Sequence, residues 1–385
     1  IMIKSLKSAF WFLFFEVLLM TIWHSIEKPT LLLNPDIARR NIRRMNEKAK
    51  AQKIRFRPHF KTHQSAEIGG WFREEGIQTI TVSSLDMAEY FARYGWQDIT
   101  VAFPVNIRQM DTIQNLAECI HLGLLIESPE VAQLLGQRLK SMADIWIKID
   151  CGYGRTGISW NQPSEVAALI SQIRRISQFN LRGILTHAGH TYIASSQEIV
   201  RRYREAIERM NRLRNELGEF GSLEVSVGDT PGCTLAGDLG EVDEIRPGNF
   251  IFYDAMQLHF GVCHPEDIAV ALACPVVARH PNRNEVVIHG GAIHLSKDYF
   301  KDGEQAIYGL VALPEGDNWS KPLPNAFVRG ISQEHGMVHL SSANIQSVQV
   351  GDLLCIIPVH SCLTVHAMRS YLTLDGKIIS TLNKD

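Results

Sequence analysis

The stretch at residues 57–63, RPHFKTH, places a lysine between two histidines, directly after a short apolar run that is typical of a strand. A solvated basic turn is the simplest interpretation, because a lysine is usually a surface charge. At the end of a buried strand, however, a lysine amine can lose its proton and form a Schiff base with an aldehyde. Lys61 is therefore the first candidate for a reactive residue.

A histidine and a cysteine two positions apart, His360 and Cys362, suggest a metal site. The surrounding apolar runs predict a strand, on which both side chains, and His366 further along, would face the same side. Imidazole and thiolate are zinc ligands, and a pair leaves positions open for water or substrate, which suits a catalytic ion. His335 is a further candidate ligand. A buried cysteine beside a structural histidine is the alternative.

Residues 152–157, GYGRTG, match a dinucleotide-binding pattern, but their surroundings disfavour that function. Pro163 delays the helix that the pattern requires, and residues 166–189 contain no acidic side chain for a ribose. The useful residue is Arg155, because a guanidinium on a glycine-rich loop can donate to an anionic or phenolate oxygen.

Two later loops, residues 225–232 (VSVGDTPG) and 246–249 (RPGN), have the composition of a phosphate-binding site. They expose backbone N–H groups, and Ser226 and Thr230 add hydroxyl donors. Asp229 is unfavourable beside a phosphate, so we expect it to point away or to accept a hydrogen bond from a neighbour. A pair of tight turns is the alternative.

These candidates lie among apolar runs that alternate with amphipathic helical patterns. Strands are predicted to begin near residues 53, 79, 98, 122, 144, 181, 223 and 244, and helices to span residues 37–50, 86–94, 108–120, 129–142, 163–176 and 197–217. This alternation predicts an α/β fold of buried parallel strands, and eight strands predict a (β/α)8 TIM-type barrel rather than an open doubly wound sheet. Catalytic residues of such barrels lie where strands end, and the candidates above follow predicted strands.

The pattern changes after about residue 261, where β-rich runs follow one another without long helices. These runs are residues 268–278, 285–293, 306–313, 337–340, 352–357, 363–365 and 371–374. They predict a C-terminal antiparallel β domain at residues 261–385, after a barrel domain at residues 25–260. The strand at residues 30–33 is expected to pair with the β domain.

The composition excludes some classes of protein. The 385 residues carry 39 basic and 41 acidic side chains, so a nucleic-acid partner is not expected. Seven cysteines without a CxxC pair argue for a reducing compartment, which predicts a cytoplasmic protein. Residues 1–24 have the outline of a signal peptide or anchor, but the apolar stretch is short and contains Glu16. We interpret residues 1–19 as the product of a misplaced start before Met20, and expect no membrane association of the folded domains.

The combination of motifs resembles the D-serine dehydratase and D-threonine aldolase group of fold-type III pyridoxal-phosphate enzymes, distant relatives of alanine racemase. The resemblance extends from about Pro29 to the C-terminus and rests on residues 57–63, 150–157, 187–192, 228–231, 246–249 and 360–362. It implies pyridoxal 5'-phosphate and a divalent metal as cofactors, with zinc expected before manganese or magnesium. It also implies a small D-amino acid as substrate and a homodimer, since barrel and β domain often complete each other's sites in this family.

The resemblance assigns roles to individual residues. Lys61 would carry the cofactor and act as base at Cα, Arg155 would bind its phenolic oxygen, and His187 would lie against its ring. The phosphate cup would consist of Ser226, Gly228, Thr230, Gly248 and Asn249, with Arg246 at the pyridine nitrogen, His190 and Tyr192 in the substrate pocket, and His360 and Cys362 on the metal.

The implied activity is that of a lyase for D-3-hydroxy amino acids, in which the lysine acts at Cα and the metal acts on the β-hydroxyl. Cys362 stands where aldolases often carry an aspartate, which favours D-serine dehydratase over D-threonine aldolase. An amino-acid racemase is less favoured, because no tyrosine motif for a second base is evident. A non-catalytic pyridoxal-phosphate carrier and a nicotinamide oxidoreductase are the remaining alternatives.

Overall fold

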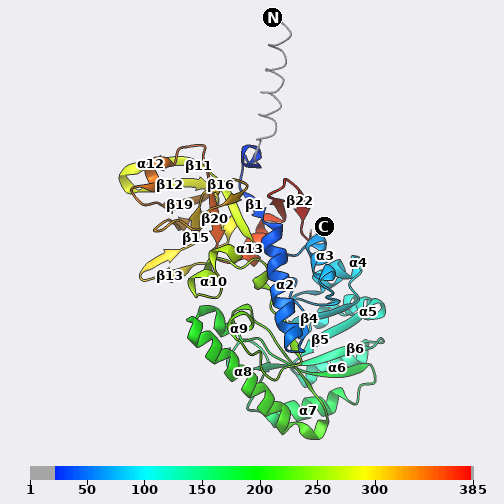
Figure 1. Ribbon diagram of the computed structural model, residues 1–385. Coiled ribbons are helices and arrows are strands. Elements are labelled where there is room, and N and C mark those ends of the chain that lie inside the picture. Colours follow the sequence, from blue (N-terminus) through cyan, green and yellow to red (C-terminus); the bar gives the residue numbers. More distant parts are fainter. Residues whose placement is uncertain (1–21, 383–385) are drawn as a thin grey trace, which may run out of the picture. The chain divides into compact units, whose positions relative to one another are not determined.

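The computed structural model describes residues 22–382, which form two compact units (Figure 1). One unit contains residues 36–268 and the chain from Ser380, and the other contains Ala269–Ile379 with the chain up to Pro35. The interpretation of residues 1–19 as a misplaced start lies outside the described residues. Within the described range, the structure has no helix with the length and apolar character of a membrane span.

The first unit is a barrel of parallel strands in the order β2-β10-β9-β8-β6-β5-β4-β3. A bridge between His59 and Thr81, with Phe60 N–H donating to Thr81 O at 2.8 Å, joins the chain after β2 to β3. The strands are β2 (Arg55–Phe56), β3 (Thr79–Val82), β4 (Asp98–Pro104), β5 (His121–Ile126), β6 (Ala143–Asp150), β8 (Phe179–Leu185), β9 (Glu224–Val227) and β10 (Glu244–Ile245), with β7 (Ile158–Ser159) beside β6. The predicted barrel and its eight strands are thus confirmed.

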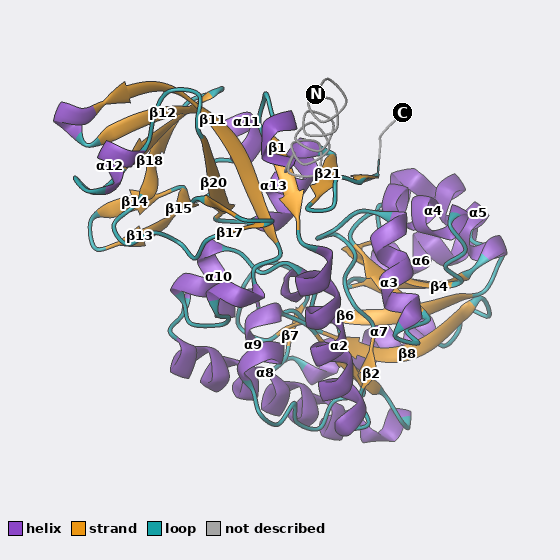
Figure 2. Cartoon of the chain, turned by 45° about the horizontal axis from the view of Figure 1, so that its top comes forward, coloured by secondary structure: helices purple, strands orange, loops and turns teal. Residues whose placement is uncertain are grey.

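Helices follow the barrel strands and surround them, as Figure 2 shows in purple. They are α2 (Pro35–Ala51), α3 (Ala66–Glu74), α4 (Leu85–Arg93), α5 (Met110–Cys119), α6 (Pro129–Arg138), α7 (Pro163–Ile173), α8 (Ser196–Glu216), α9 (Thr230–Leu235) and α10 (Ala255–His259). Serine caps start two of them, because Ser84 and Ser128 accept from the amides of Met87 and Val131. Their apolar faces are buried, which explains why the helical periodicity was readable in the sequence.

An ion-pair network holds β2, the two-residue strand before the lysine. Glu244 on β10 is fully buried and accepts from Arg55 Nε and Arg57 Nε, each at 2.7 Å. Burial alone would raise the pKa of Glu244, but the two arginines lower it to about 2, so the carboxylate stays charged. Arg57 also pairs with Asp98 at 2.5 Å, so the network ties β2 to β10 and β4.

The second unit is built on a nine-stranded sheet in the order β12-β19-β18-β15-β20-β11-β1-β21-β22. Its strands are β1 (Thr30–Leu33), β11 (Val270–His280), β12 (Glu285–His289), β15 (Gly309–Ala312), β18 (Phe327–Ile331), β19 (His335–His339), β20 (Leu353–Pro358), β21 (Ser370–Thr373) and β22 (Ile378–Ser380). Two small hairpins are β13 (Phe300–Asp302) with β14 (Gln305–Ile307), and β16 (Pro314–Glu315) with β17 (Asn318–Trp319). As predicted, Thr30–Leu33 pairs with this sheet, antiparallel to β11.

The α-helices in the described part of the second unit are short, namely α11 (Ala292–Leu295), α12 (Asn344–Ser347) and α13 (Ser361–Met368). The strand predicted at residues 363–365 is therefore wrong, because His360 is the N-cap of α13 and Cys362 lies in its first turn. His360 and Cys362, two positions apart, do not share a helix face, so the argument that placed His360, Cys362 and His366 on one face of a strand is also wrong. Cys362 and His366, four positions apart on α13, do share a face. The predicted strand at residues 285–293 ends at His289, before α11.

Candidate functional site

A cavity of about 300 Å³ lies at the carboxyl ends of the barrel strands. It is lined by His59, Lys61, Ser83, Ala102, Phe103, Pro104, Leu125, Lys148, Arg155, Thr156, Leu185, His187, Tyr192, Gly228, Asp229, Arg246, Gly248 and Asn249. Leu125 and Leu185 pack with buried Trp146 and give the cavity an apolar floor. Of the predicted site residues in the barrel, Ser226, Thr230 and His190 do not belong to this lining.

Buried neighbours fix the backbone on either side of Lys61. Phe60 is fully buried and packs edge-on against Phe91 and Trp96. The carbonyl of Lys61 accepts from Gln64 Nε2 at 3.0 Å. Burial, together with the positive charge of Lys61, holds the pKa of His59 well below its ordinary value, so this imidazole is neutral. The rigid turn therefore presents the lysine amine to the cavity.

Asp150, at the end of β6, organises the loop that carries Arg155. Its carboxylate accepts from the amides of Gly152 and Tyr153 at 2.9 Å, and from that of Gly154 at 3.1 Å. Burial opposes ionisation of Asp150, but these amides lower its pKa below the ordinary value. Gly152 and Gly154 have φ angles of 105° and 75°, where side chains are unfavourable, so the glycines serve the loop's geometry rather than a dinucleotide.

His187 and Arg246 both line the cavity, and Arg246 is buried. The Nδ1–H of His187 donates to Gly228 O. The pKa of His187 lies well below its ordinary value, mainly because the ring is buried and also because Lys61 is positively charged. Arg246 Nε donates to Ser226 Oγ at 2.7 Å, and burial lowers the pKa of Arg246 to about 10. The arginine therefore remains a cation at neutral pH.

The hydroxyl groups of Ser226 and Thr230 form hydrogen bonds with other protein groups instead of facing the cavity. Ser226 Oγ donates to Glu244 Oε1 at 2.7 Å while it accepts from Arg246. Thr230 Oγ1 accepts from the amide of Phe250 at 3.2 Å. Gly248 is in close contact with the lysine turn, since a Cβ there would lie 2.7 Å from His59 O. Of the predicted phosphate cup, the members that line the cavity are therefore Gly228, Gly248 and Asn249, and not the two hydroxyl residues.

Asp229 behaves as expected, because it accepts from its neighbours. It caps α9 by accepting from Gly232 N–H at 2.5 Å, and it accepts from Thr191 Oγ1 at 2.9 Å. Burial raises the pKa of Asp229 to about 6, although both donors oppose the shift. Beside it, Tyr192 OH accepts from the amide of Thr230 at 3.2 Å, which fixes the ring at the cavity wall.

Lys148 is a cavity residue that the sequence reasoning missed. It lies on β6 with 5% of its surface exposed, and its Nζ donates to Ile149 O at 2.7 Å. Burial lowers its pKa to about 8. The available signal was a lysine inside the apolar run 145–149, IWIKI, because an unpaired lysine is rarely placed in a buried strand without a function.

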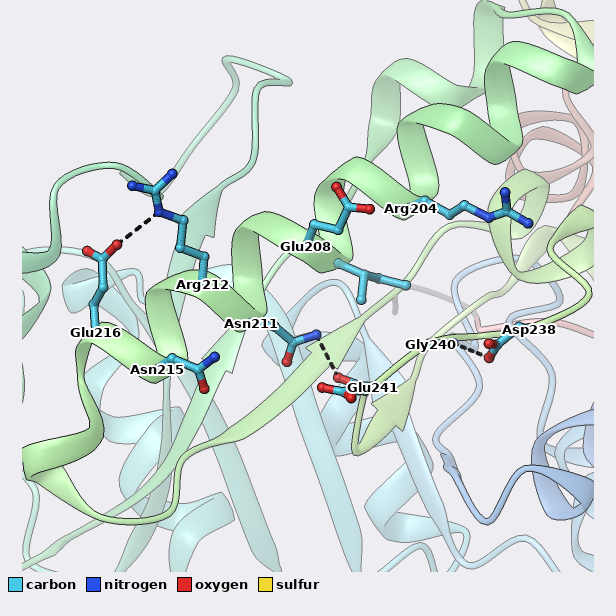
Figure 3. Close-up of a pocket in the computed structure, with 10 residues that line it drawn as sticks. Arg204, Glu208, Asn211, Arg212, Asn215, Glu216, Asp238, Gly240 and Glu241 are labelled. Atoms are coloured by element: carbon cyan, nitrogen blue, oxygen red, sulfur yellow. Dashed lines mark hydrogen bonds and ion pairs between the residues drawn. The ribbon is translucent and has the colours of Figure 1, made fainter.

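The cavity therefore has the chemistry of a site for an anionic ligand. Lys61, Lys148, Arg155 and Arg246 bring four cationic side chains, and Asp229 is the one carboxylate among the described lining residues. A larger open hollow of about 860 Å³ lies along α8 beside the loop at residues 238–241 and shares no residue with the cavity (Figure 3). Some of its polar groups pair with one another, for example Asn211 Nδ2 with Glu241 O at 3.0 Å.

The predicted metal pair lies in the second unit, at the start of α13. His360 Nδ1 donates to Asp298 Oδ2 at 2.8 Å, and both side chains are partly exposed. This hydrogen bond lowers the pKa of Asp298 and, in the neutral ring, places the imidazole proton on Nδ1, which makes Nε2 the ring atom with a lone pair. His335 begins β19 and pairs with His289 across the sheet. Among the described residues, it joins no group of three metal-ligating side chains.

The two units match two family models. Residues 33–255 match the alanine racemase N-terminal domain, and residues 269–374 match a putative serine dehydratase domain. D-threo-3-hydroxyaspartate dehydratase from Delftia sp. (strain HT23) is 27% identical over 372 residues, which cover 92% of this chain and 96% of that protein. D-serine dehydratase from Dictyostelium discoideum is 29% identical over 398 residues, which cover 93% and 96%.

Solved structures show the same architecture. The Delftia dehydratase superposes with a TM-score of 0.84 at 27% identity, covering 95% of this chain and 100% of that chain. Its solved forms include a histidine-to-alanine variant and, two positions further along, a cysteine-to-alanine variant in the metal-free form. An alanine racemase from Clostridium difficile 630 shares the fold, with a TM-score of 0.64 at 16% identity. The match covers 92% of this chain and 99% of that chain. The predicted resemblance is confirmed: the chain belongs to the family of the alanine racemase N-terminal domain, followed here by a putative serine dehydratase domain.

Proposed function

We propose that the protein is a pyridoxal-phosphate-dependent lyase for D-3-hydroxy amino acids, of the D-serine dehydratase type. The observation that carries the proposal is the position of Lys61 in a cavity whose charged side chains, apart from Asp229, are cations. A phosphorylated aromatic aldehyde needs an amine for its aldehyde, donors for its phenolate and a close backbone approach for its phosphate. The barrel cavity contains all three.

Each requirement has a residue in the cavity. Lys61 Nζ would bind the aldehyde carbon, and Arg155 would donate to the phenolic oxygen. The glycines at 228 and 248 would admit the phosphate, because their missing side chains leave the backbone exposed. Arg246, which remains charged, would donate to the ring nitrogen and keep that nitrogen unprotonated.

When bound, pyridoxal phosphate supplies an electron sink for charge that develops at Cα. The protein's part is the proton transfer, in which Lys61 Nζ takes the proton from Cα of the substrate. Burial keeps the imidazoles of His59 and His187 neutral, so neither adds positive charge beside this amine. Tyr192, held by the Thr230 amide, borders the space that remains for the substrate.

In the second unit, His360 and Cys362 would hold a divalent cation, with zinc favoured by nitrogen and sulfur ligands. Such a cation supplies a Lewis acid for a hydroxyl group. Asp298 orients the imidazole of His360 for this purpose. The proposal is supported by the Delftia dehydratase, whose histidine and cysteine variants have the same spacing and whose cysteine variant is metal-free.

A substrate panel tests the proposal. The purified protein, supplied with pyridoxal phosphate and zinc, is given D-serine, D-threonine or D-threo-3-hydroxyaspartate, and products are measured by coupled assays. We expect ammonia with a 2-oxo acid, which is pyruvate from D-serine. Glycine with acetaldehyde from D-threonine would instead identify an aldolase, the second candidate, which the resemblance to D-threonine aldolases keeps open.

L-serine and D-alanine are the matched controls. L-serine has the opposite configuration and should not react, and D-alanine lacks the β-hydroxyl, so elimination is impossible. Conversion of D-alanine to L-alanine, together with no elimination or cleavage product from the three hydroxy amino acids, would contradict the lyase and indicate a racemase.

A further inference from the structure

A second group of metal-ligating side chains lies in the β unit, apart from the His360–Cys362 pair. His289 ends β12, His294 belongs to α11, and Glu334 precedes β19. Glu334 Oε2 lies 3.5 Å from His289 Nε2 and 3.9 Å from His294 Nε2. One potential ligand atom from each residue lies within 4.8 Å of the others, and this is the one such group of three within residues 22–382. We call it the His289 cluster.

The backbone around the His289 cluster is held in place. Gly290 N–H donates to Glu334 O at 2.9 Å, and Ala292 N–H donates to Ser332 O at 2.7 Å. A Cβ on Gly291 would lie 2.4 Å from Ser332 O, so only glycine allows this close approach. The three side chains are therefore brought together by ordered backbone from two segments, and not by chance contact of flexible loops.

The ligand types select the class of ion. Two imidazoles and one carboxylate form a set that binds zinc and similar first-row divalent ions, and three protein ligands leave at least one position open. Exposed fractions of 40% for His289, 14% for His294 and 44% for Glu334 allow an ion to enter from solvent. We propose that the His289 cluster is a second divalent-metal site, of the zinc type, which joins the end of β12 and α11 to the turn before β19.

One contact has to change when the ion binds. Gly291 N–H donates to His294 Nδ1 at 3.2 Å, which places the proton of the neutral ring on Nε2. Coordination through Nε2 moves that proton to Nδ1 at the cost of this long hydrogen bond. The rival explanation is a hydrogen-bonded imidazole–carboxylate cluster that binds no metal.

Zinc binding in variants distinguishes these explanations. A Cys362→Ala protein removes one ligand of the His360–Cys362 pair, and the His289→Ala or Glu334→Gln substitution is then added. Each protein is stripped with a chelator, re-equilibrated with zinc and titrated against a chelating dye. We expect Cys362→Ala to retain a zinc site, and each added substitution to weaken its affinity by more than about tenfold. The inference does not depend on the proposed lyase activity.

His339→Ala in the same background is the matched control, because His339 is an imidazole at the other end of β19 and outside the cluster. It should leave zinc affinity unchanged. Glu334→Gln keeps the side-chain shape, and circular dichroism would verify its fold. At the same zinc concentration, the melting temperature of Cys362→Ala should rise more than that of the variant that also carries Glu334→Gln. Absence of zinc binding in Cys362→Ala, or binding that survives both cluster substitutions, would overturn the proposal.

Discussion

The two units collect opposite kinds of charge at their candidate sites. In the barrel, Lys148 and Arg246 are buried cations whose pKa values are lowered first of all by burial and also by neighbouring cations. In the β unit, His360 faces Asp298, and the His289 cluster contains Glu334, with all these groups partly exposed. Buried, uncompensated cations prepare a site for an anion, whereas imidazoles beside carboxylates prepare a site for a metal ion. The proposed function thus assigns the two cofactors to different units.

Replacing the cavity lysine should have the largest effect. Lys61→Ala is expected to lower kcat by at least about a thousandfold, because it removes both the amine that binds the aldehyde and the base at Cα. The wild type supplied with pyridoxal phosphate should show a visible absorption band that borohydride bleaches, and Lys61→Ala should lack it. Lys140→Ala, at an exposed lysine of the barrel, is the control. A band that persists in Lys61→Ala would falsify the assignment.

The pH dependence of protein stability tests whether burial lowers the pKa of the Lys148 amine. In the folded barrel its amine loses the proton near pH 8, whereas in the unfolded chain it keeps the proton to about pH 10.5. The unfolded chain then binds more protons, so stability should rise with pH across this window. Relative to Lys148→Met, the free energy of unfolding of the wild type should increase by about 3 kcal/mol, measured by urea unfolding of the cofactor-free proteins. If the free energies of unfolding of the wild type and of Lys148→Met changed in parallel with pH, the lowered pKa of Lys148 would be contradicted. Lys140→Met, at an exposed lysine, is the control.

In the β unit, the test is whether the carboxylate of Asp298 supports metal binding by His360. Asp298→Asn should weaken metal binding at the His360–Cys362 pair by about 10- to 100-fold, because the amide does not hold the Nδ1–H of His360 as a carboxylate does. Chelator competition in a Glu334→Gln background measures this pair without the His289 cluster. Asp302→Asn, on neighbouring β13, should have no effect. Equal affinities for Asp298→Asn and the parent would show that the hydrogen bond does not position the ligand.

The smallest expected effect concerns the Arg155 loop. Asp150→Asn should weaken pyridoxal phosphate binding by about three- to tenfold, because a neutral amide holds the loop amides less strongly than a carboxylate. Absorbance titration of the apoprotein measures the affinity. Asp144→Asn is the control, since Asp144 lies at the opposite end of β6 and accepts from Asn180. A similar loss in both variants would indicate a general loss of stability rather than an effect on the loop.

Local patterns in the sequence predicted the barrel well for a physical reason. Each strand–helix pair buries its own apolar face, so periodicity within a short segment reports the element directly. The prediction of a strand at residues 363–365 was wrong because Leu363, Thr364 and Val365 are residue types that are typical of strands. In the structure, His360 caps a helix there, and Thr364 Oγ1 donates to Leu295 O at 3.3 Å. Tertiary packing overrode local propensity at this point.

The sequence alone determined the barrel and the β domain and made Lys61 the first candidate for a reactive residue, because alternating apolar runs and short motifs are local properties. Only the tertiary structure revealed Lys148 as a cavity residue, since its depth depends on strands that pair across the barrel. The same is true of the partners of His360 and of the His289 cluster. Glu334 lies far from His289 along the chain, and the two meet because β12 pairs with β19 and brings their ends together.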